Sequence, residues 1–166
     1  MPKGPAARIM DPVVHPLPPV LQPGPGSHDV LIGMKPAWRG IPLASAGALM
    51  AAKVASQAQL AIAAAATIAA APTPGGPAAK AAEEAMKVKE AAAMGSMITS
   101  GAGGADIHIC ATPLPVPPHG PGVVIDGSAT VMINNLPACR MGDTILEALG
   151  PPNKIAMGEP TVIIGP

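Results

Sequence analysis

The sequence predicts a small, mainly β domain that is interrupted by an α-helical hairpin. Three observations lead to this fold class: a short strand motif occurs three times, its copies are unequally spaced, and the largest gap between them is rich in alanine. The 166 residues suffice for one domain. The chain has 23 prolines and 19 glycines, yet 49% of its residues are hydrophobic and 12% are charged, which favours a folded core over disorder.

The strand motif is an octapeptide with Gly, a polar residue, two variable positions, a Val-x-Ile core and a final Gly or Asn. Its copies are GSHDVLIG at 26–33, GSATVMIN at 127–134 and GEPTVIIG at 158–165. Turn residues on both sides of a short β-branched core predict a turn, a strand and a second turn. A second element, Pro-Ala-x-Arg, also occurs three times, at 5–8, 36–39 and 137–140. Together the copies predict a three-fold β repeat.

The copies are separated by an insertion of different composition. The octapeptides begin at residues 26, 127 and 158, so the two spacings are 101 and 31 residues. The excess of 70 residues matches an Ala-, Met-, Lys- and Glu-rich segment between about 43 and 99, which has no strand signal. We therefore expect a β domain formed by 1–40 plus 105–166 and a helical insertion at 41–104.

The insertion itself divides at the Pro- and Gly-rich stretch 71–77. We expect a first helix over 43–71 and a second from Pro77, a favourable first helical residue, to about Gly95. Two alanine-rich helices joined by a tight turn predict an antiparallel hairpin. Residues 54–71 are uncharged and just long enough to span a membrane, but alanine drives insertion weakly, so a transmembrane role is the less favoured interpretation.

Composition excludes several classes of function. The net charge is zero and the chain has one Trp but no Phe or Tyr, so neither a basic patch nor stacking residues indicate nucleic-acid binding. Two cysteines are too few for a disulfide framework. The first residues lack the apolar stretch of a secretory signal, so we expect synthesis in the cytoplasm.

Four residues form a candidate metal site. Side chains two apart on a strand point to the same side, so His108 and Cys110 are presented together. A Pro-rich link then leads to His119, and His15 lies in a similar setting before the first octapeptide. Three imidazoles and one thiolate are a set that Zn²⁺ favours. The alternative is that these are surface histidines and a buried thiol.

That alternative is preferred for the remaining candidates. His28 occupies a variable octapeptide position, and the place of Cys139 is taken by Ala7 and Trp38 in the other Pro-Ala-x-Arg copies. Four protein ligands would also close the coordination shell, whereas a catalytic zinc keeps an open position. Asp106, Asp143 and Glu147 stand in no recognisable catalytic motif. We therefore expect one structural zinc per chain and no enzymatic activity, with a small zinc hydrolase as an outside alternative.

Five segments resemble the PAAR-repeat family, whose members cap the spikes of type VI secretion systems and related phage-tail-like contractile injection systems: PAARIMD, GSHDVLIGMKPAWRG, DIHIC…PHGPG, GSATVMINNLPACRMGD and GPPNKIAMGEPTVIIG. The resemblance implies a short pseudo-three-fold β cone. Its base would sit on a trimeric β-helical spike protein (VgrG-like, or its phage-tail counterpart), one copy per trimer. Its apex would be sharpened for membrane puncture by one zinc held by His15, His108, Cys110 and His119.

The resemblance also implies delivery with the injection particle, outside the cell or into a target. One departure stands out: the second copy reads PAWRGIP, where the family more often has Arg-x-Gly-Asp, and there the chain leaves for the hairpin. Residues 43–99 are open to four roles: packing along the spike, contact with the tube or sheath, binding of a cargo protein, or a membrane-active effector function.

Overall fold

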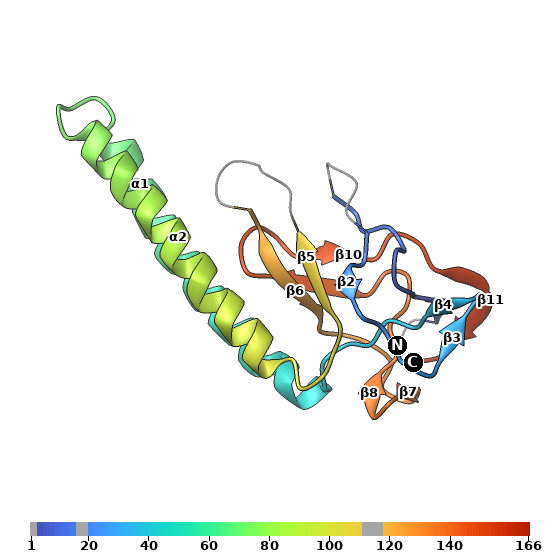
Figure 1. The fold of residues 1–166 in the computed structure, drawn as a ribbon. Helices are drawn as coiled ribbons and strands as arrows, with labels where there is room; N and C mark the ends of the chain where they lie inside the picture. Colours follow the sequence, from blue (N-terminus) through green and yellow to red (C-terminus); the bar gives the residue numbers. More distant parts are fainter. Residues whose placement is uncertain (1–2, 16–19, 111–117) are drawn as a thin grey trace.

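The structure is a computed structural model that describes residues 3–15, 20–110 and 118–166 (Figure 1). Short strands gather in one region, and two long helices lie beside them as an antiparallel hairpin. Helices account for 35% of the described residues, and strands with isolated bridges account for 28%. The architecture is therefore mixed α/β rather than mainly β, because most of the strands have only two to four residues whereas each helix has more than 25.

Within the described residues, the strands form one five-stranded and three two-stranded antiparallel sheets. The five-stranded sheet has the order β10-β9-β6-β5-β2, and the small sheets are β3-β4, β7-β8 and β1-β11. In chain order the strands are β1 (Gly4–Ala6), β2 (Pro23–Gly24), β3 (Leu31–Ile32), β4 (Lys35–Pro36), β5 (Ile107–Cys110), β6 (Gly120–Val124), β7 (Met132–Ile133), β8 (Leu136–Pro137), β9 (Thr144–Glu147), β10 (Asn153–Lys154) and β11 (Glu159–Ile164).

Each octapeptide contributes one strand to a small sheet, as the turn-strand-turn pattern predicts. In each sheet the middle residue of the Val-x-Ile core lies opposite a Pro-Ala-x-Arg proline, in the pairs Leu31–Pro36, Met132–Pro137 and Ile163–Pro5. The first two sheets are tight hairpins whose turns place both central residues at positive φ, namely Gly33 and Met34, and Asn134 and Asn135. This mirror-image turn matches the twist of paired strands. In the third sheet the two ends of the described chain pair with each other.

The three Pro-Ala-x-Arg copies meet in a closed ring of backbone hydrogen bonds. The N–H of Ala7 donates to the carbonyl of Cys139 (2.9 Å), that of Trp38 to Ala7 (2.9 Å), and that of Cys139 to Trp38 (3.1 Å). The side chains of these residues lie in one buried cluster, in which Trp38 supplies the bulk that the small Ala7 and Cys139 do not. A second cluster repeats the same pattern one residue earlier, with Ala6, Ala37 and Ala138 beside Ile32, Ile133 and Ile164.

An Arg–Asp turn follows two of the copies directly. The Asp three residues after the Arg accepts from the Arg backbone N–H (2.8 Å in both) and from its guanidinium, in the pairs Arg8–Asp11 and Arg140–Asp143. The Asp N–H donates back to the Arg carbonyl, at 3.1 and 3.2 Å. These hydrogen bonds fix the first and third Pro-Ala-x-Arg copies in chain order to the residues that follow them.

The insertion separates the corresponding pair in the second copy without breaking it. Asp106 accepts from the backbone N–H of Arg39 (2.8 Å) and from its guanidinium (2.8 and 3.1 Å), and its own N–H donates to the Arg39 carbonyl (3.0 Å). The pattern equals that of the two local turns, although Asp106 lies 67 positions along the chain. The Asp that the sequence lacks after Arg39 is therefore present, on the far side of the hairpin.

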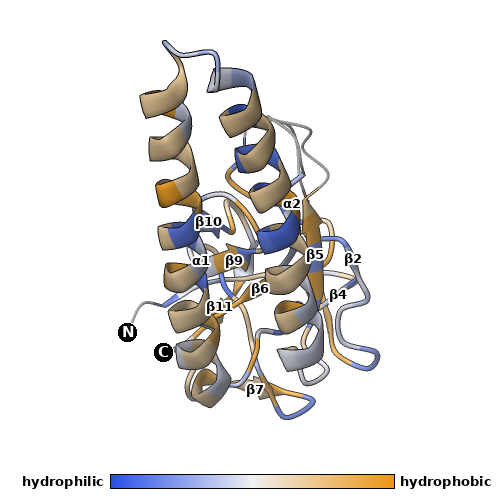
Figure 2. Ribbon diagram, turned by 90° about the vertical axis from the view of Figure 1, so that its left-hand side faces the viewer, coloured by the Kyte–Doolittle hydropathy of each residue, from blue (hydrophilic) through white to orange (hydrophobic). Residues whose placement is uncertain are grey.

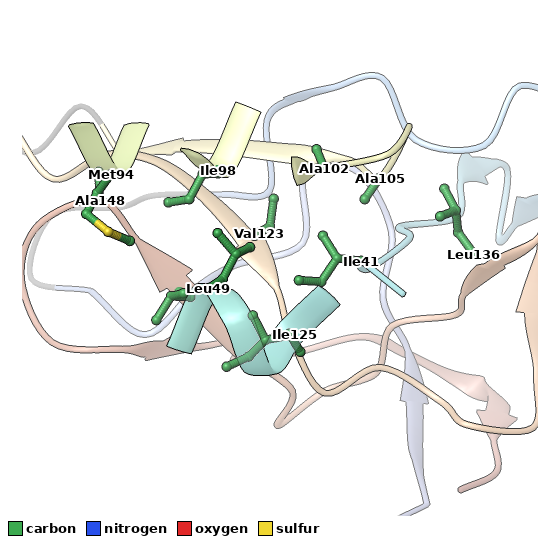
Figure 3. Close-up of a cluster of buried hydrophobic side chains, with 12 residues drawn as sticks. Ile41, Leu49, Met94, Ile98, Ala102, Ala105, Val123, Ile125, Leu136 and Ala148 are labelled. Carbon is green, nitrogen blue, oxygen red and sulfur yellow. The ribbon is translucent and has the colours of Figure 1, made fainter. Parts of the chain in front are cut away.

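The hairpin consists of α1 (Leu43–Ala70) and α2 (Gly76–Gly101). The second helix continues six residues beyond the predicted end at Gly95, because this glycine allows close packing: a Cβ there would lie 3.3 Å from the Pro121 ring on β6. Near the helix ends, Leu49, Met94 and Ile98 pack on the sheet in a buried cluster that includes Val123 (Figure 3). The two helices lie side by side in front of the strands (Figure 2), and their connecting turn lies well away from them (Figure 1).

Candidate metal centre

The position four residues after each of the three paired aspartates carries a metal-ligand side chain. It is His15 after Asp11, Cys110 after Asp106 and Glu147 after Asp143. Cys110 ends β5 and Glu147 ends β9, whereas His15 lies two residues after the isolated bridges at Pro12 and Val13. These three side chains converge and are joined by His119, which lies just before β6, so that one ligand atom of each lies within 4.8 Å of the others.

The contacts within this group are close. His15 Nε2 lies 3.0 Å from His119 Nδ1 and 3.3 Å from Cys110 Sγ, and His119 Nδ1 lies 2.8 Å from Glu147 Oε2. Cys110 and Glu147 are fully buried, and the two imidazoles are partly buried. The structure thus brings together three of the four predicted ligands and adds Glu147, which the sequence analysis did not count as a ligand.

His108, the fourth predicted ligand, is buried beside this group but is not part of it. It is 1% exposed and shares the buried side of β5 with Cys110, as the strand periodicity predicts, while Ile109 between them is 42% exposed. The position two residues after the paired aspartates is filled by Val13 and Ile145 in the other copies, and both belong to the core cluster around Trp38. His108 is therefore the polar member of a layer directly below the ligand group, with its Nε2 3.6 Å from Glu147 Oε1.

Buried polar atoms at this place fit a cation. Among the described residues, neither ring nitrogen of His108 has a hydrogen-bond partner, and Glu147 Oε1 has none either. Leaving such atoms unsatisfied costs about 1–3 kcal/mol each. A cation bound beside these atoms would give a partner to a His108 nitrogen or to Glu147 Oε1. Imidazole nitrogen, thiolate and carboxylate are all ligands that Zn²⁺ accepts. The residues present therefore fit a zinc ion.

The electrostatics favour the ligating forms of His15 and Glu147. Burial lowers the pKa of His15; the Glu147 charge opposes this, and the neighbouring His119 and His108 add to it. Burial alone would raise the pKa of Glu147, but its polar neighbours, His108 first, outweigh burial and hold the pKa below its usual value. Neutral imidazole and ionised carboxylate are the forms that bind metals.

The remaining cysteine and histidine, Cys139 and His28, lie outside this group. Cys139 is buried within the hydrogen-bonded ring, and burial raises the pKa of its thiol well above the ordinary value, so it is a core residue. The His28 side chain is 77% exposed and lies 3.4 Å from its neighbour Asp29. Both placements agree with the sequence interpretation.

A lysine of the hairpin contacts the backbone behind the metal centre. Lys53 on α1 is 4% exposed, and its Nζ donates to the carbonyl of Glu147 (2.8 Å) and to that of Ala148 (3.0 Å). Burial lowers the pKa of this amine to about 8, against the opposing effect of the Glu147 charge. The helical hairpin is thus attached to the segment that carries a member of the ligand group.

Comparison with known proteins gives one finding. The family model of the PAAR motif matches residues 114–166, a stretch that holds His119, Glu147 and the second and third octapeptides. No curated protein and no solved structure matches the chain. The motif match covers about a third of the sequence, and the ring of hydrogen bonds links that third to the copies outside it. Residues 114–166 therefore carry a PAAR motif.

Proposed function

We propose that this protein is a non-enzymatic spike tip that caps a trimeric, VgrG-like β-helical spike of a contractile injection system. The observation that carries the proposal is the ring that joins Ala7, Trp38 and Cys139. It brings three similar units of a single chain together around one centre. A trimeric β-helix ends in three equivalent sets of unpaired strand edges, and a single chain with three equivalent units can cover all of them.

The small sheets supply a surface suited to this role. Leu31, Met132 and Ile163 hold equivalent positions on β3, β7 and β11, and they are 63%, 53% and 58% exposed. The next residue of each strand is buried. Large apolar side chains that are exposed at three related positions mark an interaction surface. We call these three residues the base triad and assign to it the contact with the spike, one protein per trimer.

We further propose that the fold is a pseudo-three-fold cone whose narrow end is held by one structural zinc ion. His15, Cys110 and His119 would hold the ion with a fourth donor, for which the sequence proposes His108. These residues come from three separate segments, so the ion would cross-link the chain where the core is thin. A shell closed by four protein ligands leaves no position for a reacting water, which agrees with a structural role in membrane puncture.

The spike contact is tested by placing charges on the base triad. The variant with Leu31→Glu, Met132→Glu and Ile163→Glu should bind a co-expressed trimeric spike protein at least about 1000-fold more weakly, since each buried anchor contributes about 2 kcal/mol or more. The matched control is Ile62→Glu with Ile68→Glu, which changes exposed apolar residues of the hairpin and should leave binding unchanged. Native mass spectrometry should find one chain per trimer, and a stable 3:3 complex would contradict the proposal.

A membrane-active role of the hairpin is the second candidate. Among the described residues one helix, α1, is long and apolar enough to cross a membrane, and only 17% of its most apolar window is buried. Ile62 and Ile68 on this helix are 66% and 75% exposed. If the hairpin acts on membranes, the full chain should release dye from anionic liposomes, and the Ile62→Glu, Ile68→Glu variant should not. Equal leakage from both proteins, or none from either, would remove this candidate.

A further inference from the structure

We propose that the outer face of α1 is the docking site for a helix of a cargo protein, and that this helix contacts α1 through an apolar, uncharged stripe of its own. The inference goes beyond the spike-tip proposal and rests on it, because a cargo role presupposes an injection particle. It concerns the hairpin and the groove between α1 and the sheet, and neither the base triad nor the metal centre takes part in it.

The docking face is a continuous stripe along α1. Positions 50, 54, 57, 61, 65 and 68 recur every three or four residues, so they share one side of the helix. We call them the α1 stripe, and all six are exposed: Met50, Val54, Gln57, Ala61, Ala65 and Ile68. Its large apolar members Met50, Val54 and Ile68 are 50%, 66% and 75% exposed. The stripe extends about 27 Å along the helix, at about 1.5 Å per residue.

The stripe begins in a groove between α1 and the sheet. The groove has a volume of about 330 Å³, and Met50, Val54 and Gln57 line it from the helix. Ile125 and Leu146 line it from the sheet, and its surface is mostly apolar. A large apolar side chain of a partner can therefore be anchored at this end, while the small members of the stripe farther along let a second helix approach closely.

The charges around the stripe indicate that the partner is uncharged at the contact. No residue of the α1 stripe is charged. Two charged groups line the groove, and both already have partners within the chain. Lys53 Nζ donates to two backbone carbonyls. The Asp126 carboxylate accepts from the N–H (2.6 Å) and the hydroxyl (2.8 Å) of Thr144. A complementary helix therefore presents apolar side chains to the stripe.

The charges of the hairpin also favour a protein over a lipid surface. Its exposed charges are balanced, with three lysines and three glutamates in α2. Lys80 pairs with Glu84 (2.8 Å) and Lys87 with Glu83 (2.6 Å), whereas the one charged residue of α1, Lys53, is buried. A helix that lies on a membrane is rich in Lys and Arg beside its apolar face, and alanine drives insertion weakly. A protein helix is therefore the favoured occupant.

The hairpin is placed so that the cargo helix and the spike can bind at the same time. In Figures 1 and 2 the far end of the hairpin lies on the side of the molecule where β5 ends and β6 begins, and farther out than either strand. The small sheets that carry the base triad lie at the other end (Figure 1). A helix bound along the α1 stripe therefore extends away from the surface assigned to the spike.

Fluorescence anisotropy of the full-length protein with a labelled helical peptide tests the proposal. The peptide has about 21 residues, with Leu and Ala in one stripe and equal numbers of Glu and Lys elsewhere. We expect saturable one-to-one binding. The variant Val54→Glu, Ile68→Glu should bind about 100-fold more weakly or worse, because each new carboxylate would be buried without a partner.

The matched control changes two exposed apolar residues of α2, Val88→Glu with Met97→Glu, and should bind the peptide like the wild-type protein. Far-UV circular dichroism checks that both variants keep the helical hairpin. A peptide of the same composition in scrambled order should not bind.

Three results would overturn the proposal. The first is no peptide binding, or equal binding by the wild-type protein and the Val54→Glu, Ile68→Glu variant. The second is flotation of the wild-type protein with phosphatidylcholine or phosphatidylserine vesicles that this variant loses, because lipid would then be the occupant. The third is a wild-type dimer in sedimentation that the variant abolishes, because a second copy would then cover the stripe. No spike protein is present in these measurements, so the spike-tip proposal keeps its own test on the base triad.

Discussion

Cys110→Ser should bind zinc far more weakly than the wild-type protein and should unfold at a much lower temperature. Cys110 is fully buried and its Sγ lies 3.3 Å from His15 Nε2, so the thiolate is central to the group. Structural zinc contributes about 10–16 kcal/mol of apparent binding free energy in small domains at pH 7, and much of it is folding free energy. We expect the unfolding midpoint to fall by more than about 10 °C.

Calorimetry and elemental analysis check this result, and chelation of the wild-type protein should reproduce the shift. The matched control is Cys139→Ala, because Cys139 is equally buried but lies in the hydrogen-bonded ring. It should keep one zinc per chain and lose only the stability expected of a small core truncation. A wild-type midpoint that does not change on chelation would contradict a structural role for the metal.

Asp106→Ala should destabilise the full-length protein by about 3–5 kcal/mol, the usual effect of removing one partner of a buried ion pair. The Asp106 side chain is fully buried, and its carboxylate bonds the guanidinium and backbone N–H of Arg39 as well as the N–H of Gly26. All of these donors would lose their acceptor. Denaturant unfolding measures the loss. Asp29→Ala, at an exposed aspartate, is the control and should cost much less.

Deletion of 41–104 gives the complementary result. It joins Gly40 to Ala105, so that Asp106 follows Arg39 by three positions, the spacing of Arg8–Asp11 and Arg140–Asp143. We expect the shortened chain to fold and to bind zinc, with lower solubility because Val123 and Leu146 lose their helical cover. A deletion variant that cannot fold would show that the hairpin is part of the β fold rather than an insertion into it.

The sequence predicts those parts of the fold that repeat locally. The Val-x-Ile copies predict strands β3, β7 and β11, and the alanine-rich segment predicts both helices to within a few residues except at Gly95. The predicted end near Gly95 is wrong, because α2 continues to Gly101 and Gly95 packs against the Pro121 ring, which outweighs the low helix propensity of glycine. Asp106 could not be paired with Arg39 from the sequence, because 66 residues lie between the two.

The sequence predicts three of the four residues in the candidate metal site. His15, Cys110 and His119 follow from ligand chemistry, whereas Glu147 was missed because carboxylates are common on surfaces and no catalytic motif surrounds it. The signal was present in its place four residues after Asp143, which equals the place of His15 after Asp11. The same spacing joins Asp106 to Cys110, but this becomes apparent only once Asp106 is known to pair with Arg39 as Asp11 pairs with Arg8.

The bonds of Lys53 to the Glu147 and Ala148 carbonyls connect the helical hairpin to the segment that carries Glu147. A partner bound at the far end of α1 and α2 would pull on that segment through the buried amine and through the packing of Leu49, Met94 and Ile98 on the sheet. In the proposed spike tip, a load applied to the hairpin would therefore reach the candidate ligand group through the contacts between hairpin and sheet.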